Sequence, residues 1–166
     1  MADTRILLAI DDSAASKRAV KYVARLVGRK GFRICLVHVL PPLPPALLEH
    51  GGSENPQQEV QLEVELRAEQ ELWTSKKQKE AQGSLNKASA TLRKAGLSAK
   101  SVQTIFCEPA DGRVAAEDIL QMARECKCQT VVAGRQSVSW FHELFSQDLA
   151  EELMRCGKGF SVWLVE

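Results

Sequence analysis

Two apolar runs near the start of the chain constrain its fold more than any other feature. Residues 6–10 and 32–40 are mainly apolar, a pattern typical of strands that are buried on both faces of a parallel sheet. Between the two runs, apolar residues recur at helical spacing: Ala15, Ala19, Val20, Val23, Ala24 and Val27. A strand, a helix and a second strand within roughly 30 residues predict parallel strands that are joined by a right-handed crossover.

The last third of the chain repeats this alternation. It predicts strands over residues 101–106, 130–133 and 160–165, and helices over residues 113–126 and 141–156. With the first strand in the centre, the order of the sheet becomes 3-2-1-4-5. We therefore predict an α/β fold, an open five-stranded parallel sheet of order 3-2-1-4-5 with helices on both faces. A chain of 166 residues fits a single domain over residues 1–166.

The middle of the chain differs in composition from both ends. Residues 43–56 are rich in proline and glycine and predict a loop. Residues 57–95 are dominated by good helix formers and predict a long helix, or two helices broken near Gly83. A core-facing stripe on this helix would consist of Val60, Val64, Leu72, Leu85, Ala88 and Leu92. We expect residues 43–80 to form a variable loop and an extended helix.

Charge and cysteine content limit the class of protein. With 22 basic and 21 acidic side chains the net charge is +1. The chain therefore lacks the excess of basic residues that is typical of nucleic-acid-binding proteins. The sequence has neither a membrane-length apolar run nor a signal-peptide pattern, so we expect no membrane association and a cytoplasmic protein. Five cysteines, an odd number, predict reduced thiols. We expect Cys126 and Cys128 to be buried, unrelated thiols rather than a metal or redox pair.

The predicted topology locates a binding crevice. Ligands of open parallel sheets bind beyond the carboxyl ends of the strands, where the strand order reverses. Here that point lies between the first and fourth strands, which lead into Asp11 and Asp12 and into Gly134 and Arg135. Val39, near the end of the second strand, would lie close to the same crevice.

Four stretches of the sequence resemble the universal stress protein family. Residues 6–13, Ile-Leu-Leu-Ala-Ile-Asp-Asp-Ser, are similar to its opening strand and acidic turn, and Val-His-Val at 37–39, followed by prolines, to its second strand. Residues 131–137 resemble its fourth strand and the start of its nucleotide loop, and residues 161–165 its last strand. The likeness covers nearly the whole chain, is weakest over residues 43–80, and implies a Rossmann-like, adenine nucleotide alpha hydrolase-like fold.

The ATP-binding branch of that family carries the motif Gly-x2-Gly-x9-Gly-[Ser/Thr] in this loop. By the resemblance, Gly134 matches the first glycine and Ser137 the second, while Gln147 and Asp148 replace the third glycine and the hydroxyl. Glycines let the backbone approach phosphates, and amides at a helix N-terminus donate to them. A carboxylate at position 148 would repel a phosphate, and in the loop only Arg135 would offset it. The match implies a degenerate site with weak or lost ATP binding.

The base side of the site is better preserved. Asp11 and Val39 match family positions that hold the adenine base, so the candidate nucleotide-binding residues are Asp11, Val39, Gly134, Ser137, Gln147 and Asp148. We expect no resident cofactor and no metal, with ATP or AMP as the alternative ligand. Mg²⁺ on Asp11, Asp12 and Asp148 stays open, beside the plainer interpretation that the first two only charge and cap a helix start and that Asp148 is a surface acid.

The remaining candidate residues do not form a recognisable catalytic motif. We expect His38 to be a core histidine with satisfied hydrogen bonds. For His50 the sequence indicates no interaction partner. The sequence contains no Ser-His-Asp arrangement, complete P-loop or paired-acid motif, so we expect no enzyme. Trp140 and Phe141, in the altered loop, either plug the crevice or contact a partner.

These observations leave more than one function open. The strand from Phe160 to Val165 would be an apolar sheet edge, which invites pairing, and the resemblance implies dimerisation through that strand. We expect a homodimer that serves as a non-catalytic stress-response domain through dimerisation and contacts with unidentified proteins. The alternative is a switch in which ATP or AMP biases residues 43–56. In a third interpretation the long helix is a docking element for a regulatory partner.

Overall fold

The fold was determined as a computed structural model, which describes residues 4–27, 31–108, 115–135 and 149–166. The five strands are β1 (Thr4–Ile10), β2 (Phe32–Val39), β3 (Val102–Cys107), β4 (Thr130–Gly134) and β5 (Ser161–Val165). They form one sheet of order β3-β2-β1-β4-β5, in which every neighbouring pair is parallel. The predicted strand order is confirmed.

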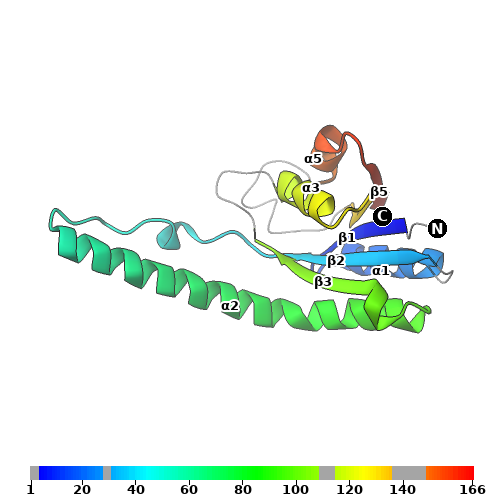
Figure 1. The fold of residues 1–166 in the computed structure, drawn as a ribbon, viewed down its shortest axis with the longest axis horizontal. Helices are drawn as coiled ribbons and strands as arrows, with labels where there is room; N and C mark the ends of the chain where they lie inside the picture. The colour runs from blue at the N-terminus through cyan, green and yellow to red at the C-terminus, as the bar shows by residue number, and fades with distance from the viewer. Residues whose placement is uncertain (1–3, 28–30, 109–114, 136–148) are drawn as a thin grey trace.

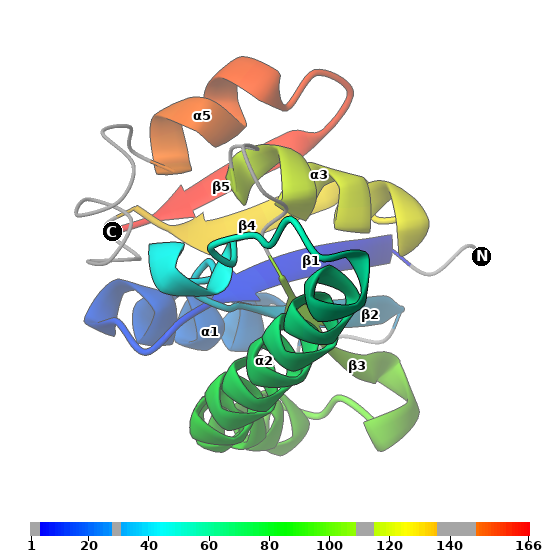
Figure 2. The ribbon, with the colours of Figure 1, turned by 90° about the vertical axis from the view of Figure 1, so that its left-hand side faces the viewer.

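Helices cover both faces of this sheet (Figure 2). One face carries α1 (Ala14–Val27) and α2 (Pro56–Lys94), and the other carries α3 (Ala115–Glu125) and α5 (Leu149–Cys156). Two short 3-10 helices, Pro45–Leu47 and Ala99–Ser101, lie in the connections. In β1, Ile6 and Leu8 pack toward α1 and α2, whereas Leu7 and Ala9 pack toward α3 and α5. This alternation within a fully apolar strand explains why the run shows no polar face.

The turn between β1 and α1 is fixed by side-chain hydrogen bonds. Ser13 caps α1, because its Oγ accepts a hydrogen bond of 3.1 Å from the Ser16 amide. One carboxylate oxygen of Asp11 accepts a 2.8 Å bond from the Ser13 amide. The Asp11 amide in turn donates to Ser16 Oγ at 2.9 Å. The polar residues that follow β1 are therefore held in one arrangement.

The long helix α2 corrects part of the sequence prediction. It runs for 39 residues without a break at Gly83, since helix-forming neighbours outweigh the roughly 1 kcal/mol cost of one interior glycine. The predicted stripe is buried only in the carboxyl-terminal part, at Leu85, Ala88 and Leu92. In the amino-terminal part, Val60, Val64 and Leu72 are 61%, 63% and 74% exposed.

The reason for this exposure is visible in the shape of the molecule. The amino-terminal half of α2 projects beyond the sheet, so no strand lies beneath it (Figure 1). The connection between β2 and α2 runs alongside this half of the helix (Figure 1). Gln70 Nε2 of α2 donates a 2.7 Å hydrogen bond to the Leu47 carbonyl in that connection. Asn55 caps the helix by accepting a hydrogen bond from the Gln57 amide.

Some predicted features lie outside the described residues. The predicted helices over 113–126 and 141–156 are described as Ala115–Glu125 and Leu149–Cys156, and Trp140 and Phe141 fall in the undescribed part. Among the helices that are described, none is both long and apolar enough to cross a membrane.

Candidate functional site

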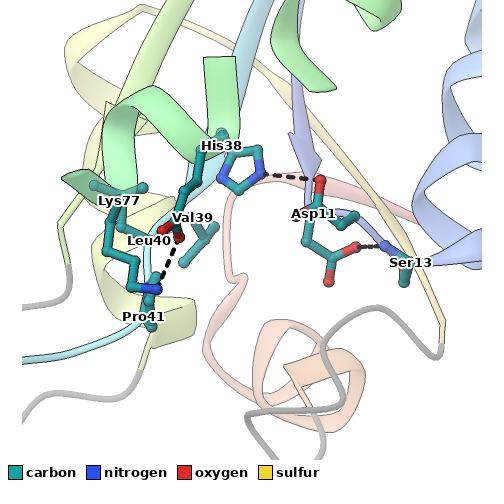
Figure 3. A pocket seen from close by; sticks show the side chains of 10 residues that line it. Asp11, Ser13, His38, Val39, Leu40, Pro41 and Lys77 are labelled. Carbon is teal, nitrogen blue, oxygen red and sulfur yellow. Dashed lines mark hydrogen bonds and ion pairs between the residues drawn. The ribbon is translucent and has the colours of Figure 1, made fainter. Parts of the chain in front are cut away.

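A cavity of about 310 Å³ lies at the carboxyl ends of β1 and β2, against α2. Its wall is formed by the turn after β1, the end of β2 and the middle of α2: Asp11, Asp12, Ser13, His38, Val39, Leu40, Pro41, Lys77, Glu80 and Ala81. Figure 3 shows the His38 ring directed toward the turn that carries Asp11 and Ser13. The cavity lies at the carboxyl edge of the sheet, where ligands of open parallel sheets bind, but beside β1 and β2 rather than at the predicted reversal point between β1 and β4.

Asp11 lines this cavity and carries a buried carboxylate oxygen. Its Oδ1 is bound to the Ser13 amide, whereas its buried Oδ2 has no hydrogen-bond partner among the described residues. An unpartnered buried oxygen costs about 1–3 kcal/mol. A ligand that donates an N–H or O–H to this atom would recover that free energy.

His38 is buried as expected, but its ring makes no well-formed hydrogen bond in the described structure, although the Val39 backbone interacts with it. Within the described part of the chain, neither ring nitrogen has a hydrogen-bond partner, and Nε2 lies 4.0 Å from the exposed Asp12 carboxylate. Burial lowers the pKa of His38 below its ordinary value of 6.5, although Asp12 and Asp11 oppose this shift. The neutral ring offers one donor and one acceptor beside Asp11.

Helix α2 supplies the other side of the cavity and is tied to the turn after β1. Ser84 Oγ donates a hydrogen bond to the Asp12 carboxylate. Lys77 forms a 2.8 Å ion pair with Glu80, and this contact lowers the pKa of the Glu80 carboxyl. Asp11, Asp12 and Glu80 thus face one lysine in the described wall, and this excess of carboxylates disfavours a bound phosphate.

The predicted site residues divide into three groups. Asp11 and Val39 line the cavity together. Gly134 ends β4, where a Cβ would lie 2.6 Å from the carbonyl carbon of Ala15, so glycine is required there by the close approach of β4 and α1. Ser137, Gln147 and Asp148 lie outside the described residues, and the phosphate side of the predicted site therefore has no structural description.

Arg135 is engaged in a contact that the sequence did not predict. Its amide donates a 2.8 Å hydrogen bond to the Val165 carbonyl, and its guanidinium forms an ion pair with the Glu166 carboxylate. The charge expected to offset Asp148 therefore already faces another carboxylate.

Sequence reasoning missed the part of the wall that α2 supplies. Lys77, Glu80 and Ala81 lie far along the chain from the end of β2, and no motif connects them to it. His38 carried a weak signal, since it directly precedes Val39 at the end of a strand that leads to the predicted crevice. A polar residue in that position faces either a neighbouring helix or the ligand.

A second polar cluster lies near the start of α2. Ligand atoms of His50, Glu59 and Glu63 lie within 4.8 Å of one another, and His50 Nε2 is 3.6 Å from Glu59, so the expectation that His50 has no partner is wrong. His50 Nδ1 accepts a 3.2 Å hydrogen bond from the Gly52 amide, which places the proton of the neutral ring on Nε2. This tautomer suits a hydrogen bond to Glu59 better than a metal ion.

Taken together, the sheet and its cavity define a doubly wound α/β protein with a cavity at the carboxyl edge of its strands, beside β1 and β2. Residues 4–158 match the sequence model of the universal stress protein family. The chain belongs to that family. A search among curated proteins gives no match to the sequence.

Solved structures share this fold at low sequence identity. A universal stress protein family member from Burkholderia pseudomallei is 18% identical, with 98% of this chain and 95% of that chain covered and a TM-score of 0.64. A universal stress protein in complex with cAMP is 14% identical, with coverages of 100% and 98% and a TM-score of 0.58. One from Archaeoglobus fulgidus in complex with dAMP is 17% identical, with both chains fully covered (100%) and a TM-score of 0.52.

Proposed function

We propose that this chain is a non-catalytic regulatory domain of the stress response that acts through homodimerisation and contacts with other proteins. Its cavity takes the base end of an adenine nucleotide and binds ATP weakly or not at all. The observation that carries the ligand class is the unpartnered Asp11 Oδ2 beside the two unpartnered ring nitrogens of His38, counted over the described residues. The related structures in complex with cAMP and dAMP support an adenine-type ligand.

The weak binding of ATP rests on the charges around the cavity. Its described wall carries the carboxylates of Asp11, Asp12 and Glu80, and Lys77 is already paired with Glu80. Arg135 is paired with Glu166. Phosphates added to the ligand therefore meet more repulsion than attraction, and we expect AMP to bind at least as tightly as ATP.

The absence of catalysis is proposed from the state of the hydroxyls nearest the cavity. Ser13 Oγ accepts a hydrogen bond from the Ser16 amide, and Ser16 Oγ accepts one from the Asp11 amide. Both hydroxyls are engaged with the backbone, and among the described residues neither forms the serine–histidine pair that would activate a nucleophile. We expect no hydrolysis of bound ATP.

The homodimer is proposed from β5 (Ser161–Val165), which is an edge strand of the sheet in the described part of the chain. On its other side this strand pairs with β4, and Val162, Trp163, Leu164 and Val165 are only half-buried. An apolar edge invites pairing, most often in a two-fold dimer. Multi-angle light scattering should give twice the chain mass of 18.3 kDa, and a monomer at micromolar concentration would contradict this part of the proposal.

Calorimetric titration with Mg-ATP, Mg-ADP and AMP tests the ligand class. We expect AMP to bind and Asp11→Ala to abolish its binding, while Glu125→Ala, an exposed acid at the end of α3, leaves it unchanged. ATP binding in the micromolar range that is tighter than AMP binding and is lost in Asp11→Ala would overturn the proposal. Tight ATP binding that appears only after Ser137→Gly, Gln147→Gly and Asp148→Ser would support a degenerate phosphate site.

A nucleotide-binding switch is the second candidate function, and a second cavity favours it. This cavity, also about 310 Å³, lies between α1 and α2 and shares Asp11 and Asp12 with the first. Lys17, Lys21 and Lys87 line it, so phosphates that extend into it would meet positive charge. A ligand in both cavities would contact α2 and Pro41 together and could bias residues 43–56. Proteolysis within residues 43–56 that slows when Mg-ATP is added would favour the switch.

A further inference from the structure

Three thiols that are far apart in the sequence converge on one face of the sheet. Cys35 lies in β2, whereas Cys126 and Cys128 flank Lys127 in the connection from α3 to β4. The Sγ atoms of Cys35 and Cys126 are 2.9 Å apart, closer than the roughly 3.5–4.0 Å at which smaller, non-bonded carbon atoms pack. The prediction that Cys126 is buried is wrong, since it is partly exposed, and its contact with Cys35 is one that the sequence did not predict.

The backbone of the connection holds Cys126 in this position. The Lys127 amide donates to the Arg124 carbonyl at 3.0 Å and the Cys128 amide to the Ala123 carbonyl at 2.8 Å. With Lys127 at a φ of 56°, these two bonds form a Schellman motif at the end of α3. Arg5 of β1 adds a 3.2 Å hydrogen bond from Nη1 to the Cys126 carbonyl. The contact with Cys35 thus rests on a fixed turn rather than on a free side chain.

Burial and charge give the three thiols different properties. Cys35 and Cys128 are buried, whereas Cys126 is partly exposed. The hydrogen bond from Cys35 and the charge of Arg5 lower the pKa of the Cys128 thiol. The same contact and burial raise the pKa of the Cys35 thiol. These shifts favour a thiolate at the buried Cys128, so the choice of Cys126 as the reacting thiol rests on its partial exposure and its contact with Cys35.

We propose that Cys35 and Cys126 are a reversible thiol–disulfide pair that reacts with hydroperoxides. The sulfur of the partly exposed Cys126 attacks one peroxide oxygen, the O–O bond breaks, and a sulfenic acid and one water form. Cys35 then attacks the sulfenic sulfur, the S–S bond forms, and a second water leaves. The two thiols lose two electrons and two protons in total, and one hydrogen peroxide molecule accepts them.

The resulting bond would join β2 to the turn at the end of α3. Cys35 lies four residues before Val39 on the same strand, about 13 Å away at 3.3 Å per residue. The pair is therefore separate from the cavity that the proposed function uses. The test of peroxide reactivity can therefore fail while the test of nucleotide binding succeeds, and the reverse.

The chain offers matched controls for a direct test. The protein is treated with hydrogen peroxide, free thiols are alkylated, and peptides are analysed by mass spectrometry without reduction. Trypsin cuts after Lys127 and so separates Cys126 from Cys128. We expect loss of two of the five free thiols, an intramolecular Cys35–Cys126 peptide, and full recovery with dithiothreitol.

Single cysteine-to-serine variants then show which cysteines form the disulfide. Cys35→Ser and Cys126→Ser should each abolish the crosslink, while Cys107→Ser and Cys156→Ser should leave it intact. Retention of all five thiols under peroxide, a crosslink that involves Cys107, Cys128 or Cys156 instead, or exclusively intermolecular disulfides would overturn the proposal. The peptide map of the unmutated protein decides the question even if a serine variant fails to fold.

Discussion

The Nε2 atom of His38 lies 4.0 Å from the Asp12 carboxylate, and this relationship moderates a pH dependence of stability that the burial of His38 creates. Burial lowers the pKa of His38 below 6.5 in the folded protein, against the opposing charges of Asp12 and Asp11. Below pH 6.5 the unfolded chain therefore binds a proton that the folded protein does not yet bind. The free energy of unfolding should fall as the pH falls from 7.5 to 5.5, by at most about 1.4 kcal/mol per pH unit from this group.

Urea unfolding at pH 5.5, 6.5 and 7.5 measures this effect, with His38→Gln as the control. The glutamine variant cannot titrate, so its free energy of unfolding should change less over the same range. Asp12→Asn removes a charge that favours protonation of His38 and should make the pH dependence steeper. An equal pH dependence in the unmutated protein and in His38→Gln would assign the effect to other groups.

Two glycines should respond to alanine with opposite signs. A Cβ at Gly134 would lie 2.6 Å from the backbone of Ala15, whereas a Cβ at Gly83 meets no atom of the described structure within 4 Å. Gly134→Ala should destabilise the protein by about 1–3 kcal/mol or more through overpacking. Gly83→Ala should stabilise it by about 0.5–1 kcal/mol, because alanine is the better residue inside α2. Chemical denaturation checks both, and a neutral Gly134→Ala would show that β4 and α1 separate easily.

The sheet could be predicted from the sequence because its signal is local. Strands such as β1 and β4 are buried on both faces and carry unbroken apolar runs, and the connections between parallel strands follow a fixed handedness. Asp11 and Val39 were placed at the same crevice for the same reason, since the carboxyl ends of neighbouring parallel strands share one edge.

Other features depend on distances that no local pattern encodes. Helical periodicity indicates which side of α2 is apolar, but it does not tell where the sheet beneath the helix ends, so Val60 was wrongly expected in the core. The contact between Cys35 and Cys126 joins residues 91 positions apart. The unpartnered nitrogens of His38 depend on which neighbours fail to reach the ring, and a pattern within β2 cannot show that.

The cap of α1 should contribute measurably to stability. Ser13→Ala removes the oxygen that accepts a hydrogen bond from the Ser16 amide. The substitution should lower the free energy of unfolding by about 0.5–2 kcal/mol. Ser98 precedes a short 3-10 helix without capping it through its side chain, so Ser98→Ala is a matched control with a smaller expected effect. Urea unfolding of both variants gives the comparison, and equal losses would argue against a specific role for the Ser13 cap.

The two halves of α2 should differ in their sensitivity to truncated side chains. Leu85 is 1% exposed and packs in the core, whereas Leu72 is 74% exposed on the projecting half of the same helix. Leu85→Ala should destabilise the protein by about 2–5 kcal/mol through lost burial and the cavity that remains. Leu72→Ala should change stability by less than about 0.5 kcal/mol, as surface substitutions usually do. Denaturant unfolding at low and high protein concentration measures both, and a loss at Leu72 that approaches the loss at Leu85 would mean that the projecting half is covered in solution.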